Sequence, residues 1–388
     1  MPESRWNHVL YRKSTLFWVL LVAGLAVSVQ AYITQSHNNY FIFKYSFLHL
    51  IHWQNLYVGY PAEHRDLYLY SPTFALLMAP FAYLPNWLGV SLWILWNCAA
   101  MYFAINLFPK YDNRKKVVLL AIILIECITS IQNQQTNPLI AAGIVLAFVC
   151  FERKKVFWAA FFIMYAGFIK VFGLAAAALF LMYPNKGKFM ASMVFWGAVF
   201  VLAPLVVVPY SQLVLQYQNW FHQLAAVQAS ENTSHPHSTF PPLSVMGWLK
   251  TWFQWNIPVM YVQLIGVVLL FAPLLKTRFY KLLSFRYLFL ASLLVFCVIF
   301  NHIAESPSYV IAVFGVAIWF TQEKKNGWIW FLLGLCLVFT ILSPTDIFPR
   351  PIRTHYVIPY VLKAVPCILI WCWLQYRIWS MKKGEVPA

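Results

Sequence analysis

The sequence predicts an all-α integral membrane protein. Of its 388 residues, 62% are hydrophobic and only 10% are charged, whereas a soluble domain has about 25% charged residues. Long apolar runs such as Ile257–Leu275 alternate with short basic clusters. Aromatic residues make up 19% of the chain, and such rings favour membrane interfaces and cavity walls. This composition excludes a soluble enzyme.

The distribution of basic residues predicts the topology. Most of the 28 Lys and Arg residues lie in short clusters between apolar runs, which is typical of cytoplasmic loops and argues against nucleic acid as a partner. One threading puts these clusters and both termini in the cytoplasm, with about 12 transmembrane helices. The expected spans are 15–35, 88–108, 117–132, 137–151, 156–170, 171–184, 189–209, 257–275, 287–301, 309–321, 328–343 and 358–378.

The first span, 15–35, is expected to be a transmembrane helix and not a cleavable signal, since no clear cleavage site follows it. The proline-bounded segment 71–85 would have both ends outside, so we expect it to be re-entrant or interfacial; a thirteenth span is the alternative. The short spans 156–170 and 171–184 are expected to be broken or tilted around a cavity. Segment 244–255 is expected to be an amphipathic interfacial helix.

We expect the whole chain, 1–388, to form a single polytopic membrane domain whose outer loops cover about 36–70, 210–256, 301–308 and 344–357. Ionisable groups near membrane depth are candidate sites, because burying charge in lipid is costly. Glu126 lies inside an expected span and receives no role in this prediction.

The first outer loop holds the run Glu63 to Asp66, followed by Tyr70 at the start of the proline-bounded segment. We predict that Asp66 belongs to the functional site, with His64, Arg65 and Tyr70 binding substrate. An ordinary solvated loop is the alternative, for Glu63 above all.

The loop 301–308 holds Asn301, His302 and Glu305 between two apolar segments, where little solvent explains so many polar groups. A site role for Glu305 or His302 is predicted, with Asn301 binding substrate, and a structural hydrogen-bond network is the alternative.

Lys170 lies at the outer end of an expected helix between Gly167 and Gly173. We predict that it binds a phosphate head group, and a snorkelling lysine is the alternative. The amide-rich run 131–138 includes Gln135 and Asn137, whose uncharged donors and acceptors suit sugar hydroxyls. A polar turn is the alternative there.

Three motifs in order, Tyr70-Ser71-Pro72, Gln135 to Pro138 and Gly167 to Lys170, resemble glycosyltransferase family 87 of the GT-C superfold over roughly residues 15–310. The resemblance implies a GT-C-like fold and a polyprenyl-phosphate sugar, typically mannose, as donor. It implies a glycan or glycolipid acceptor, membrane lipids as surroundings, and no cofactor or metal, because the donor carries no nucleotide. The expected location is the bacterial inner (plasma) membrane, with the active site facing the periplasm or exterior.

In that superfold an acid of the first outer loop takes the proton of the acceptor hydroxyl while the anomeric configuration inverts. Family members usually place an Asp soon after the first helix, whereas this sequence has His37-Asn38-Asn39-Tyr40 there. We therefore assign the base to Asp66 and expect Glu305, with His302, to orient hydroxyls. The alternatives are a transporter or lipid-linked sugar flippase, and an inactive envelope-assembly factor.

Overall fold

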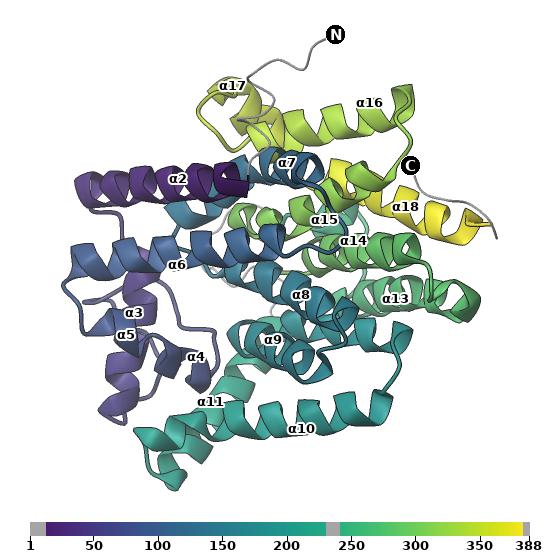
Figure 1. Ribbon diagram of the computed structural model, residues 1–388. Coiled ribbons are helices and arrows are strands. Elements are labelled where there is room, and N and C mark those ends of the chain that lie inside the picture. The colour runs from purple at the N-terminus through teal and green to yellow at the C-terminus, as the bar shows by residue number, and fades with distance from the viewer. Residues whose placement is uncertain (1–12, 230–240, 383–388) are drawn as a thin grey trace. The chain divides into compact units, whose positions relative to one another are not determined.

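The computed structural model describes residues 13–229 and 241–382, and every regular element in those ranges is a helix (Figure 1). The contacts divide the chain into two compact units. Unit 1 comprises Met1–Lys110, Ser130–Ala177 and Asn185–Glu231, and unit 2 comprises Tyr111–Thr129, Ala178–Pro184 and Asn232–Ala388.

Several helices of the described ranges are apolar, as expected of an integral membrane protein. Three of them are long and apolar enough to cross a membrane: Ser14–Thr34, Asn86–Asn106 and Lys186–Val206. The number of spans, about 12 by sequence, stays a prediction. Shorter apolar helices cover Asn137–Glu152, Val156–Ile169, Val171–Met182, Val259–Leu275, Leu283–Ile299, Ser306–Gln322 and Gly327–Leu342.

Unit 1 is built around α8, in which every residue from Asn137 to Phe151 is buried. Helix α8 packs on α6 and α9, α2 packs on α6, and α10 packs on α9 (Figure 1). A helix enclosed on all sides reads as a continuous apolar run, as this one does. The elements of unit 1 are α2 (Lys13–Thr34), α3 (Asn38–Ile51), α4 (Pro72–Leu77), α5 (Ala79–Ala82), α6 (Asn86–Asn106), α8 (Asn137–Glu152), α9 (Val156–Ile169), α10 (Lys186–Leu202), η2 (Ala203–Val206) and α11 (Tyr210–Ala229).

Unit 2 is built around the pair α14 and α15, which pack closely along their lengths (Figure 1). Gly315 permits this approach, because a Cβ there would lie 2.5 Å from the Ala291 carbonyl oxygen. Its elements are α12 (Val245–Phe253), α13 (Val259–Phe271), η3 (Ala272–Leu275), η4 (Thr277–Phe279), α14 (Leu283–Ile299), η5 (Ser306–Ser308), α15 (Tyr309–Gln322), α16 (Gly327–Leu335), η6 (Cys336–Leu342), α17 (Arg350–Ile352), η7 (Arg353–Val357) and α18 (Val365–Ser380). Helices α7 (Asn113–Gln132) and η1 (Val171–Met182) each contribute to both units.

The predicted outer loops contain helices of their own. Helix α3 lies within 36–70, α11 and α12 within 210–256, and the short α17 within 344–357. Helix α3 lies in a segment that the sequence analysis assigned to an outer loop, although its buried residues Tyr40, Phe43, Phe47 and Leu50 recur at helical spacing. Segment 71–85 forms two short helices, α4 and α5, and α12 is the helix expected in 244–255.

Candidate functional site

Asp66 is held at the first turn of α3. Asn38 Nδ2 donates to Asp66 Oδ2 at 2.8 Å, and Asn38 Oδ1 accepts from the Arg65 backbone N–H at 2.9 Å. His64 Nδ1 lies 2.8 Å from the Asp66 carbonyl oxygen, a contact that requires the proton on Nδ1. The Asp66 carboxylate is half-buried, Arg65 is exposed, and the start of a helix favours negative charge. The amide side chain of Asn38 and the His64 ring therefore both help to position this acid.

Glu63, the other acid of the first loop, is bound by a histidine. His49 Nε2 lies 2.8 Å from Glu63 Oε2, and the His49 ring stacks on Tyr60 with ring centres 3.9 Å apart. Burial lowers the pKa of His49 more than the neighbouring carboxylate raises it, which favours a neutral ring beside the Glu63 carboxylate. Burial likewise lowers the pKa of His64. Glu63 thus has a structural partner and is not simply solvated.

The amide-rich turn lies against the same end of α3. Asn39 Nδ2 donates to the Asn133 carbonyl oxygen at 2.8 Å. Gln134 has a φ of 48°, a left-handed conformation that turns the chain sharply before α8 begins. Gln135 and Asn137 are both buried. The first turn of α3 therefore contacts both the loop that carries Asp66 and the turn that carries these two amides.

Lys170 joins three separate segments of unit 1. Its Nζ donates to Asn137 Oδ1 at 3.1 Å and lies 5.6 Å from the centre of the Tyr70 ring, within the range of a cation–π contact. The structure thus brings together three of the residues predicted to bind substrate. All the partners that Lys170 Nζ makes within the described ranges are uncharged.

The break at Lys170 depends on close packing. Helix α9 ends at Ile169, Lys170 is extended with φ −138° and ψ 129°, and η1 follows. A Cβ on Gly173 would lie 2.6 Å from the Ala166 carbonyl oxygen, closer than side chains tolerate. The flanking glycines therefore act by letting η1 approach the last turn of α9, as the expected break requires.

Ser71 fixes the Tyr70 segment against the end of α9. Its Oγ donates to the Phe168 carbonyl oxygen at 2.5 Å and accepts from the Phe74 N–H at 3.1 Å, which caps α4. The Tyr57 hydroxyl donates to the Tyr70 carbonyl oxygen at 2.9 Å. These bonds hold the Tyr70 ring in reach of the Lys170 ammonium group.

The predicted residues of the 301–308 loop belong to unit 2. Asn301 Oδ1 accepts from the backbone N–H two residues later at 3.1 Å, and His302 Nδ1 lies 3.4 Å from Gln263 Nε2. Asn301, His302 and Glu305 are all partly buried. The role of Glu305 and His302 in orienting hydroxyls stays a prediction.

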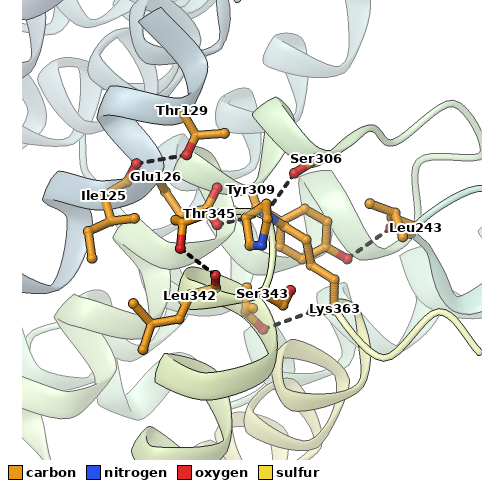
Figure 2. A network of polar contacts seen from close by, with 12 residues as sticks. Ile125, Glu126, Thr129, Leu243, Ser306, Tyr309, Leu342, Ser343, Thr345 and Lys363 are labelled. Atoms are coloured by element: carbon orange, nitrogen blue, oxygen red, sulfur yellow. Dashed lines mark hydrogen bonds and ion pairs between the residues drawn. The ribbon is translucent and has the colours of Figure 1, made fainter. Parts of the chain in front are cut away.

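Sequence reasoning missed a buried ion pair next to this loop (Figure 2). Lys363 Nζ lies 2.7 Å from Glu126 Oε1 and donates to Ser306 Oγ at 2.9 Å. The two charged side chains are 4% and 0% exposed. The signal was present in the sequence as two opposite charges within apolar segments, but their separation gave no reason to pair them.

Most of the chain matches a known protein family. Residues 68–300 match the family model for glycosyltransferase family 87. The matched region is more than half of the chain and includes Tyr70, Gln135, Asn137 and Lys170, while it begins just after Asp66 and ends just before Asn301. No curated protein matches the chain.

Proposed function

Because this chain belongs to glycosyltransferase family 87, we propose that it transfers a hexose, such as mannose, from a polyprenyl-phosphate donor to a glycan or glycolipid acceptor. Family membership makes it a membrane glycosyltransferase. We further propose that the reaction takes place at the outer face of a bacterial inner membrane. The main support for this proposal is that Lys170 contacts both Asn137 and the Tyr70 ring in unit 1.

Lys170 supplies the charge that a donor phosphate requires. Its Nζ contacts an amide oxygen and an aromatic ring, and among the described residues no carboxylate lies within ion-pair distance of it. Lys363, by contrast, is neutralised by Glu126. A half-buried ammonium group without a counter-ion favours an anionic ligand, because the partly desolvated charge gains more from pairing than it would in water.

The neighbouring amides suit the sugar. Asn137 already contacts Lys170, and the buried Gln135 lies in the same turn. Side-chain amides both donate and accept hydrogen bonds, so this turn can hold hydroxyls next to the phosphate.

Asp66 is the proposed general base. Its carboxylate takes the proton from the acceptor hydroxyl as the hydroxyl oxygen attacks the anomeric carbon. The bond from that carbon to the phosphate oxygen breaks, polyprenyl phosphate leaves, and the configuration inverts. Asn38 orients the carboxylate, His64 holds its backbone, and the exposed Arg65 is left to contact substrate.

A transfer assay tests this proposal. Purified protein in lipid nanodiscs should move labelled sugar from a polyprenyl-phosphate donor to a glycolipid acceptor and release polyprenyl phosphate. The same sugar supplied as a nucleotide donor should give no product. Movement of intact lipid-linked sugar across a vesicle membrane without any transfer would favour the flippase alternative.

Lys170→Met should weaken donor use by roughly tenfold or more, because hydrogen bonds to charged groups contribute about 1.5–3 kcal/mol. The loss should appear in the KM for the donor in the transfer assay. Lys44→Met is the matched control: Lys44 lies in α3 of the same unit and donates to Asn86 Oδ1 at 2.7 Å and to the Leu84 carbonyl oxygen. Equal donor KM values for the Lys170 variant and the native protein would rule out the phosphate role.

A further inference from the structure

The buried ion pair of Lys363 and Glu126 is not explained by helix packing alone. Both side chains are buried, and Glu126 lies in α7 among apolar neighbours such as Ile122 and Ile123. Removing two charges from water costs about as much as their attraction returns, so an apolar pair of similar size would hold the helices equally well. A buried pair of this kind is therefore weak evidence for added stability, and in some proteins such pairs fix one arrangement of the chain.

Lys363 holds the 301–308 loop through a hydrogen bond. Its Nζ donates to Ser306 Oγ at 2.9 Å, and Ser306 directly follows Glu305 (Figure 2). The lysine is itself anchored, because Thr340 Oγ1 donates to its carbonyl oxygen at 2.8 Å. The contacts thus run from α7 through Glu126 and Lys363 to the residue beside Glu305.

A second set of contacts holds the other side of Glu305. The Leu243 backbone N–H donates to the Ala304 carbonyl oxygen at 3.1 Å. The Tyr309 hydroxyl donates to the Leu243 carbonyl oxygen at 2.9 Å, and the Tyr309 ring lies 5.1 Å from Lys363 Nζ. Glu305 therefore lies between two residues that the same small network holds in place.

The turn that presents Lys363 contains a strained residue. Val361 has a φ of 56° and is fully buried, a conformation that β-branched residues rarely adopt. Such conformations persist where the surrounding structure demands them, and they gather at functional sites. This strained residue lies two positions before Lys363.

We propose that Lys363, neutralised by Glu126, is a positioning residue that holds the 301–308 loop so that Glu305 can orient hydroxyls of the acceptor or sugar. The role of Glu305 in this inference rests on the proposed function. The holding of the loop does not, and the two are measured separately.

Hydrogen–deuterium exchange of the purified full chain measures the holding directly. Ser306→Ala removes only the contact with the lysine and leaves the ion pair intact. Since a hydrogen bond to a charged group is lost, amide exchange in 301–308 should rise roughly tenfold or more, while α8 keeps its native rates. Native exchange in this loop would overturn the proposal whether or not the chain transfers sugar.

Two lysine variants extend the test. Lys363→Met should also loosen the loop, and Glu126→Met/Lys363→Met, which buries no unpaired charge, should fold and still show the fast exchange. Lys325→Met is the matched control, because the exposed Lys325 lies over the Phe320 ring at 4.0 Å and bonds to the Phe320 and Glu323 carbonyl oxygens, away from the loop. A tight loop in the double variant would overturn the proposal.

Kinetic measurements distinguish a positioning role of Lys363 from a general loss of structure. Ser306→Ala should lower kcat severalfold with an unchanged donor KM, because Lys170 and its partners remain intact. Glu305→Gln should lower kcat without loosening the loop. Fast exchange together with native kcat in Ser306→Ala would show that the loop is held but that its position does not serve the reaction, which overturns the positioning role alone.

Discussion

Asp66→Asn should lower the rate of sugar transfer by about 10²–10⁴-fold, the usual cost of losing a general base. The amide keeps the shape of the side chain but cannot accept the proton of the acceptor hydroxyl. Insertion into the membrane and donor binding should persist, because Lys170 and Asn137 are untouched. Single-turnover transfer by purified protein measures the loss without interference from product release.

An exchange variant makes this test sharper. Asn38 and Asp66 are 28 residues apart in sequence and share one hydrogen bond of 2.8 Å. The variant Asn38→Asp/Asp66→Asn moves the carboxylate across that bond and keeps the amide–carboxylate pair. It also places the acid in the stretch 37–40, where the resemblance to the family puts an Asp. We expect it to recover roughly tenfold or more of the lost rate.

The matched comparison is Glu305→Gln in the same assay. Near-native transfer by Asp66→Asn combined with an inactive Glu305 variant would move the base to the 301–308 loop. If the exchange variant stays as slow as Asp66→Asn, the carboxylate acts only from position 66.

Lys363→Met should lower the free energy of unfolding by about 3–5 kcal/mol, because it leaves the Glu126 carboxylate buried without its counter-charge. Glu126→Met/Lys363→Met should stay close to native stability, since neither charge is then buried. Denaturation of the detergent-solubilised protein, followed through its tryptophan fluorescence, compares the two.

The difference in unfolding free energy between Lys363→Met and the double variant shows whether the ion pair itself adds stability. If the double variant loses as much stability as the single one, the pair itself stabilises the fold, and the cost does not come from an unpaired charge. In that case the ion pair would need no positioning role to explain it.

Composition and local pattern determined the fold class of this protein. The excess of apolar residues, the clustered basic residues and the glycines around Lys170 are properties of neighbouring residues, so they can be recognised before any tertiary contact is known. The short motifs around Tyr70, Gln135 and Lys170 identified the family for the same reason. Helix α12 was predictable because its amphipathic pattern repeats within a few turns.

Only the tertiary structure decided which side chains meet. Helix α3 places Asn38 against Asp66 and Asn39 against the amide-rich turn. Lys363 and Glu126 are 237 residues apart and form an ion pair that no local sequence pattern indicates. The reason is physical: hydropathy reports whether a residue prefers water or lipid, whereas the partner of a buried charge is chosen by the packing of distant helices.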